Sequence, residues 1–155
     1  GKFPVASTFD DVLEAIGTLY RDDHDYKTLV IDSASALEPV IWSKVCEEHA
    51  KDSIEELGYG KGYVEAVYKW RQLLQGLDAL RTEKNMASIL IGHVKVKRFD
   101  DPLGDSFDQY QFDVHDKASA AIFRWADSFS TLMYFIFAPL PTNTSTHPAC
   151  KDEAL

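Results

Sequence analysis

Two polar side chains that follow apolar runs could do chemistry on a bound phosphate ligand. Asp32 follows the run LVI at 29–31, and His93 follows ASILIG at 87–92. An apolar run closed by Asp and then Ser33 is typical of a carboxylate that holds a nucleotide-bound Mg²⁺ through water or the adjoining hydroxyl. The same pattern suits an Asp that caps the next helix. His93 is either a polar strand end with a local hydrogen bond or a sensor of the nucleotide's terminal phosphate.

A second set of candidates lies in the aperiodic stretch 95–113, which we interpret as a long loop. Basic and aromatic side chains alternate there, a combination that binds single strands through phosphate contacts and base stacking. Five aspartates in the same stretch favour a solvated loop instead, and the composition leaves both interpretations open. The basic and aromatic candidates are Lys95, Lys97, Arg98, Phe99, Tyr110 and Phe112.

Lys117 and Arg124 form a third candidate pair, on the helix expected over 114–126. Residues seven apart share one face of a helix. Most such residues contact solvent only, but this pair could also reach the phosphates of a neighbouring subunit.

Helices and strands are expected to alternate along the chain. Apolar spacing of three and four predicts helices over 9–20, from a Ser33 or Ser35 cap through 46, and over 63–83 and 114–126. Compact apolar runs predict strands at 28–32, 87–94 and 129–137, with the first two buried on both faces. Helix followed by buried strand, twice over, indicates an α/β fold with a mostly parallel sheet.

Composition bounds the class of protein. A chain of 155 residues with 45% hydrophobic and 26% charged residues is expected to be one domain, over 1–137, with a disordered Pro/Thr-rich tail at 138–155. No apolar run approaches the length of a membrane helix, so we expect no membrane association. Two cysteines suit a reducing compartment, which favours a cytoplasmic location. A net charge of −9 means that any nucleic-acid binding needs a local basic patch.

No phosphate-binding loop of the Walker A type occurs in the chain. That motif, GxxxxGK[ST], lies between a strand and a helix, so that its amide hydrogens point at the phosphates. The glycine-rich run GYGKGY contains Gly-Lys, but Lys61 is followed by Gly62 and no strand precedes the run. We interpret 58–63 as a loop that can approach another molecule closely.

The order of these signals resembles the RecA-like recombinases. LVIDSASALEP is similar to their Walker B segment, which is followed by a first DNA-binding loop, a long helix, a strand ending in a nucleotide sensor, and a second DNA-binding loop. The closer resemblance is to phage AAA-type nucleotide-binding proteins, P-loop ATPases associated with single-strand annealing recombination. IEELGYGKGYV, HVKVKRF and DQYQF are the segments most similar to that group.

The resemblance implies a RecA-like three-layer α/β/α fold that binds ATP and Mg²⁺. Asp32 becomes the catalytic carboxylate associated with magnesium through water, Ser33 its cofactor-binding neighbour, and His93 the catalytic sensor. Tyr59, Lys61 and Tyr63 would contact single-stranded DNA from the first loop, and Lys95, Lys97, Arg98 and Phe99 from the second.

Further expectations concern what this chain can do alone. The family's Walker A strand, loop and helix would lie upstream of Gly1, so we expect an amino-terminally truncated core that is inactive without them. Their absence would expose sheet edges, which invite a homo-oligomer or a partner chain to complete the sheet. A phage protein of this kind would act in the cytoplasm of its bacterial host. The alternative is a nucleotide-independent oligomerisation or adaptor domain with a remnant of the same fold.

Overall fold

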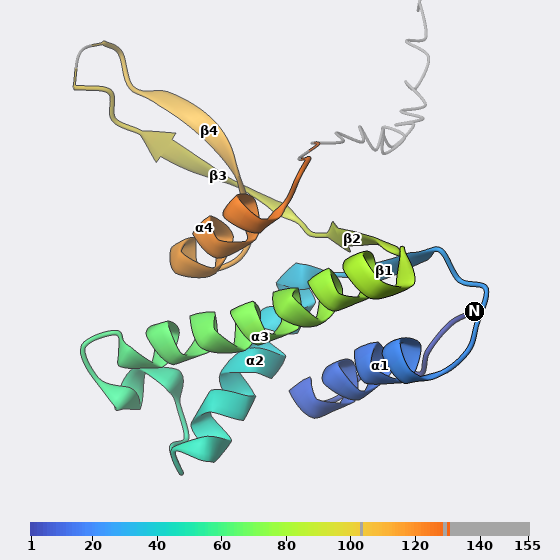
Figure 1. The fold of residues 1–155 in the computed structure, drawn as a ribbon. Helices are drawn as coiled ribbons and strands as arrows, with labels where there is room; N and C mark the ends of the chain where they lie inside the picture. Colours follow the sequence, from blue (N-terminus) through green and yellow to red (C-terminus); the bar gives the residue numbers. More distant parts are fainter. Residues whose placement is uncertain (103, 129, 131–155) are drawn as a thin grey trace, which may run out of the picture.

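The computed structural model describes residues 1–102, 104–128 and 130 of this chain. The described part has a mixed α/β fold, with four α-helices, one short 3₁₀ helix and two two-stranded sheets (Figure 1). The strand expected at 129–137 and the tail expected at 138–155 lie outside these residues, apart from Ser130. In the described part of the chain, no helix is both long and apolar enough to cross a membrane.

The amino-terminal half follows the expected order of elements closely. Helix α1 spans Phe9–Arg21, strand β1 Thr28–Asp32, helix α2 Ala34–Glu48 and helix α3 Lys61–Lys84. Thr8 and Asp11 form a capping box that satisfies backbone N–H groups at the start of α1. The loop expected at 58–63 is shorter than expected, because α3 already begins at Lys61, and the 3₁₀ helix Ile54–Leu57 precedes it.

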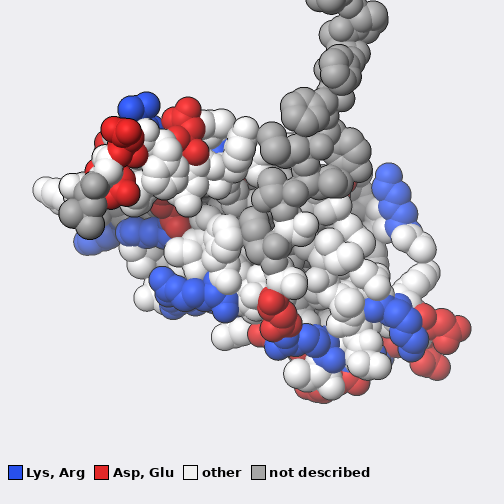
Figure 2. Space-filling model, turned by 90° about the horizontal axis from the view of Figure 1, so that it is seen from above, with Lys and Arg blue, Asp and Glu red and all other residues white. Residues whose placement is uncertain are grey.

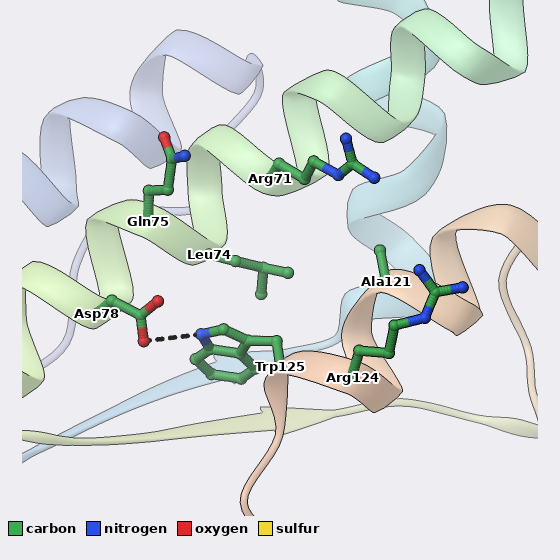
Figure 3. Close-up of a pocket in the computed structure, with 7 residues that line it drawn as sticks. All are labelled: Arg71, Leu74, Gln75, Asp78, Ala121, Arg124 and Trp125. Carbon is green, nitrogen blue, oxygen red and sulfur yellow. Dashed lines mark hydrogen bonds between the residues drawn. The ribbon is translucent and has the colours of Figure 1, made fainter.

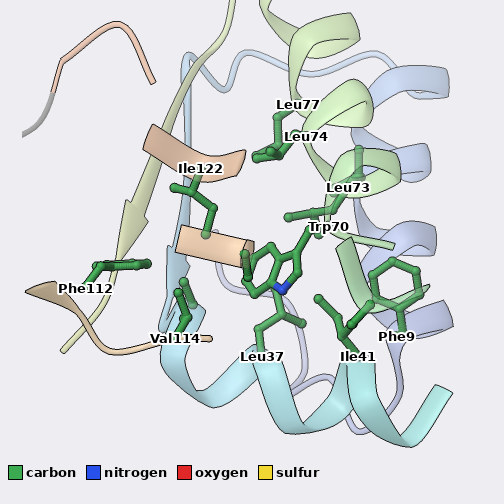
Figure 4. Packing of buried hydrophobic residues seen from close by; sticks show 14 of the residues in the cluster. Phe9, Leu37, Ile41, Trp70, Leu73, Leu74, Leu77, Phe112, Val114 and Ile122 are labelled. Atoms are coloured by element: carbon green, nitrogen blue, oxygen red, sulfur yellow. The ribbon is translucent and has the colours of Figure 1, made fainter. Parts of the chain in front are cut away.

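Helix α3 is the centre of the hydrophobic core. It contacts α1, α2, α4 and β2, and its Trp70, Leu73, Leu77 and Leu80 are fully buried. Figure 4 shows Trp70, Leu73 and Leu77 in one cluster with Ile41 of α2 and Ile122 of α4. The helix ends at Asn85, whose left-handed conformation lets its N–H bond the Leu80 carbonyl and turns the chain into the next strand.

Strands β1 and β2 (Ala87–Ile91) pair in parallel, with Val30 opposite Ile89 and Asp32 opposite Ile91. The parallel pairing of these two strands is therefore confirmed. The expectation that both faces are buried is wrong for the described residues. Leu29, Ile31 and Leu90 pack against the core, whereas Val30, Ile89 and Ile91 are 50%, 49% and 45% exposed. An apolar run means that both faces of a strand could be buried. Among the described residues, however, the core covers only one face of this strand pair.

The loop expected at 95–113 is instead an antiparallel hairpin. Strand β3 (Val94–Phe99) pairs with β4 (Phe107–Phe112) over six residue pairs, and the hairpin projects away from the helices (Figure 1). Apolar and polar residues alternate over residues 94–97, which is a strand pattern, but the alternation stops at Arg98 and Phe99. Helix α4 follows at Asp116–Trp125, and its observed start is two residues later than expected.

Candidate nucleotide and nucleic-acid sites

The parallel pairing brings the two candidate chemical residues to the same end of the sheet. Asp32 is the last residue of β1 and lies opposite Ile91, and His93 follows Ile91 by two residues. Both side chains are exposed. This end is formed by the carboxyl ends of both strands, the position at which open α/β sheets bind their ligands.

Ser33, and not Asp32, caps helix α2. Its hydroxyl oxygen accepts a hydrogen bond from the Ala36 N–H at 3.2 Å. The interpretation of Asp32 as a helix cap is therefore not supported, and its carboxylate stays exposed beside the cap. Such a carboxylate suits a Mg²⁺ that keeps most of its water and phosphate ligands. The described residues hold no group of three or more side chains that could ligate a metal ion.

His93 is held through its backbone. Its N–H donates to the Ser35 hydroxyl at 3.0 Å, and its carbonyl accepts from the Asp113 N–H at 2.8 Å. These bonds tie the strand end to the start of α2 and to the base of the hairpin. The imidazole ring forms no hydrogen bond with the described residues, which leaves it available for a ligand at the sheet end.

A buried carboxylate that the sequence analysis missed lies one helical turn below this end. Glu38 is only 7% exposed, and its two oxygens accept the His115 N–H at 2.8 and 2.9 Å. Burial raises the pKa of this carboxyl, while the hydrogen bond from His115 and the charge of Lys95 lower it. A signal was present in the sequence, because Glu38 falls on the stripe of α2 that also buries Ala34, Ile41 and Val45.

The base of the hairpin is fastened to the helices around Glu38. Lys95 donates to the Val114 carbonyl at 2.7 Å, and its ammonium lies 3.7 Å from Asp113. The His115 ring stacks on Tyr63, with ring centroids 4.2 Å apart and planes at 5°. Burial lowers the pKa of His115. Glu38 of α2 and His115 therefore connect α2 with the segment between the hairpin and α4.

The three residues expected to contact DNA from the first loop differ in their exposure. Tyr59 is fully exposed with φ of 47°, and Lys61 is exposed as the first residue of α3. Tyr63 is instead partly buried, with its ring edge-on to Trp42 at 5.5 Å and stacked on His115. Its ring is not free to stack on a base in this conformation.

The expected contacts of the second loop lie on the hairpin, and each cation has an acidic neighbour. Lys97 donates to Asp116 at 2.7 Å, and the Arg98 guanidinium lies 3.6 Å from Asp100. The hydrogen bond from Lys97 lowers the pKa of Asp116. Acidic and basic side chains are accordingly intermixed at the hairpin end of the molecule (Figure 2).

The aromatic residues of the hairpin differ in exposure. Phe99 and Phe107 form a tilted pair with ring centroids 5.2 Å apart, and they are 46% and 50% exposed. Tyr110 is 55% exposed. Phe112 is 5% exposed and belongs to the core, so its ring holds the hairpin base in place rather than facing a ligand.

Lys117 and Arg124 lie on the exposed side of α4, as their spacing indicated. Arg124 also lines a hollow between α4 and α3, opposite Arg71 (Figure 3). Neither Lys117 nor Arg124 forms an ion pair with another described residue.

The described residues thus form a mixed α/β fold in which an exposed aspartate ends β1 and a serine caps the helix that follows. A family model described as an AAA domain matches residues 1–149, and the chain belongs to this family of P-loop NTPases. Typical members bind ATP with Mg²⁺. Comparison with curated proteins gave no match, and comparison with solved structures gave none either.

Proposed function

We propose that this chain is the core of a RecA-like, ATP-dependent protein that acts on single-stranded DNA in recombination or annealing. In this proposal the AAA domain has the three-layer RecA-like arrangement, and β1 and β2 belong to its larger sheet. The protein would be phage-encoded and would act in the cytoplasm of the host bacterium.

The observation that supports the proposal best is the parallel register of β1 and β2. It puts Asp32 and His93 at one sheet end, and His93 leads directly into the hairpin. Asp32 would hold a Mg²⁺ of the nucleotide through water, with Ser33 beside it. His93 would contact the terminal phosphate, and its backbone bonds to Ser35 and Asp113 would pass the nucleotide state to the hairpin.

The hairpin would contact the nucleic acid. Exposed Phe99 and Tyr110 offer stacking surfaces, and Lys97 and Arg98 offer charges that can exchange their carboxylate partners for phosphates. Tyr59 and Lys61 would add contacts from the turn before α3.

The test is binding of a fluorescent oligo(dT) at rising salt, with and without ATP and Mg²⁺. A double variant, Lys97→Ala with Arg98→Ala, should weaken binding and reduce the slope of log K against log salt by about 1.4, since each lost phosphate contact on a single strand accounts for about 0.7. The matched control, Lys2→Ala with Lys51→Ala, removes the same charge from two exposed positions outside the hairpin. No binding by the unsubstituted chain at low salt would refute the proposal.

Asp32→Asn tests the nucleotide part separately. Loss of the carboxylate should abolish any change in oligo(dT) affinity that Mg²⁺ and ATP produce, while nucleotide-free binding stays the same. An unchanged response to Mg²⁺ and ATP would remove Asp32 from the proposed site.

A second candidate function is a nucleotide-independent oligomerisation or adaptor domain. The open apolar face of the strand pair, with Val30, Ile89 and Ile91 near half exposure, favours it. In this case a second copy or a partner chain covers that face or extends the sheet. Sedimentation velocity over a hundredfold concentration range tests it, because a single concentration-independent monomer would exclude self-association.

A further inference from the structure

A hollow between helices α3 and α4 has the chemistry of a ligand site. It has a volume of about 310 Å³, at the lower end of the range of about 300–1,000 Å³ typical of ligand pockets. Leu74 and Ala121 contribute apolar surface to it, and Arg71 and Arg124 lie on its two walls (Figure 3). Figure 3 shows both guanidinium groups toward one end of the hollow, with Asp78 and Trp125 at the other.

The cations around this hollow are not neutralised by the described part of the chain. Arg71, Lys117 and Arg124 form no ion pair there. The one carboxylate in the lining, that of Asp78, is already bound by the Arg81 guanidinium at 3.2 Å and by the Trp125 indole at 2.9 Å. The hairpin differs, because Lys95, Lys97 and Arg98 all lie within 4.0 Å of an aspartate. An anionic chain therefore meets less competition between α3 and α4 than on the hairpin.

Aromatic rings accompany these charges. The hydrogen bond from the Trp125 indole to Asp78 fixes the orientation of a ring that is partly exposed and lines the hollow. On α3, Tyr68 is 55% exposed and its ring lies 5.9 Å from the Arg71 guanidinium. Unpaired cations beside pre-oriented aromatic rings are the combination that binds single-stranded nucleic acid through phosphates and stacked bases.

The exposed ridge of α4 connects this hollow with the hairpin. A second hollow, of about 320 Å³, lies on the other side of the helix between α4 and the hairpin, lined by Lys97, Tyr110 and Phe123 among others. Successive helical residues are rotated by about 100°. Lys117 and Arg124 therefore lie on one stripe of α4. Arg124 lines the first hollow, and the stripe separates the other α4 residues of that hollow from those of the second hollow. A nucleic-acid strand that runs from the hairpin across α4 would therefore reach Lys117 and Arg124 first and Arg71 after them.

We propose that single-stranded nucleic acid continues from the hairpin across α4 into the hollow between α3 and α4. Arg71, Lys117 and Arg124 bind successive phosphates, and one base stacks on Trp125. This inference rests on the proposed function, since it takes the same ligand and extends its path to a surface of which the sequence indicated only Lys117 and Arg124, as contacts to a neighbouring subunit.

The experiment compares three variants of the full chain in the oligo(dT) salt titration. Arg71→Gln with Arg124→Gln should reduce the salt slope by about 1.4, for two lost phosphate contacts. Its control, Lys2→Gln with Lys51→Gln, changes the net charge equally and should leave the slope unaltered. Lys97→Ala with Arg98→Ala reports on the hairpin alone.

Tryptophan fluorescence supplies a second measurement that does not depend on affinity. Trp70 is fully buried and Trp42 is packed against Tyr63, so quenching by bound oligo(dT) should come from Trp125. Trp125→Phe keeps a ring for stacking but should abolish the quenching while oligo(dT) still binds.

The outcomes separate this inference from the proposed function. Suppose that the hairpin variant loses binding, that Arg71→Gln with Arg124→Gln leaves the salt slope unchanged, and that Trp125→Phe leaves the quenching unchanged. The α3–α4 path is then refuted and the proposed function stands. If the arginine variant alone loses binding, the hollow binds the nucleic acid without the hairpin, and the continuous path from the hairpin is refuted. If poly-glutamate quenches Trp125 and oligo(dT) does not, the hollow binds an acidic protein segment and the inference is refuted.

Discussion

Glu38 offers the sharpest test of how the start of α2 is coupled to the hairpin. Replacing it by Ala removes the acceptor for the His115 N–H and leaves that group without its partner, at a cost of about 1–3 kcal/mol. One buried methylene group is also lost, at about 0.8 kcal/mol. Relief from burying a charge offsets part of this sum, so we expect Glu38→Ala to lower the free energy of unfolding by about 2 kcal/mol. For a chain of this size that corresponds to roughly 4–8 °C in Tm.

Glu38→Gln separates the hydrogen bond from the charge. The amide oxygen can still accept the His115 N–H, and no ionisation cost remains, so at pH 7 this variant should be at least as stable as the unsubstituted chain. Burial raises the pKa of Glu38 above its ordinary value of 4.5, which means that the folded state binds the proton more readily than the unfolded state. The stabilisation from this proton is complete below pH 4.5 and is lost as the pH rises through the folded-state pKa. Between pH 4.5 and the folded-state pKa of Glu38, the free energy of unfolding of the unsubstituted chain should therefore fall relative to that of Glu38→Gln. Above this pKa the difference between the two proteins should stay constant.

Chemical denaturation followed by far-UV circular dichroism between pH 4 and 8 measures both effects. Glu56→Ala is the control, because Glu56 is exposed and its side chain forms no hydrogen bond with a described residue. Equal destabilisation by Glu38→Gln and Glu38→Ala would refute the reasoning, since it would mean that the charge and not the acceptor holds the hairpin base.

Three further predictions concern positions outside the proposed sites. Gly62→Ala should destabilise the chain by more than 1 kcal/mol in a thermal melt, because the new Cβ would lie 2.3 Å from the Ile54 carbonyl oxygen. Gly17→Ala should stabilise it by about 0.5–1 kcal/mol, since only a flexible side chain must move and Ala favours the helix; destabilisation there would contradict the packing of α1. The hydrogen bond to Glu83 raises the pKa of Tyr20, so Glu83→Gln should shift the phenol's absorbance titration to lower pH, and an unshifted titration would show that the bond is absent in solution.

The elements that sequence patterns predicted well are those with strong local signals. Helix α1 has a capping box and a clear apolar stripe, and its observed start at Phe9 is the expected one. Strand β1 was located to the residue because the polar stretch before Thr28 and the cap at Ser33 bound a short apolar run. The meeting of Asp32 and His93 at one sheet end also followed from local order, because two strands joined by a helical crossover run in parallel.

The features that were missed depend on contacts between distant residues. The alternation that marks a strand covers only four residues of β3, 94–97, and the pairing that completes the hairpin joins residues up to 18 apart, Val94 with Phe112. The role of Phe112 in the core could not be read from a stretch rich in exposed aromatics. Glu38 and the hollow between α3 and α4 arise from pairs such as Glu38 with His115 and Asp78 with Trp125, which are 77 and 47 residues apart.

Gly92 has a consequence for variation within this family. It joins β2 to β3, and a Cβ built there would lie 2.1 Å from the ring of Phe112, so the aromatic ring occupies the space that a side chain would need. The direction in which the β3–β4 hairpin leaves the rest of the protein is thus set by the absence of a side chain at Gly92 together with the large ring of Phe112. Relatives with a bulkier residue in place of Gly92 should have a smaller one in place of Phe112. Relatives in which both residues are large should hold the hairpin at a different angle.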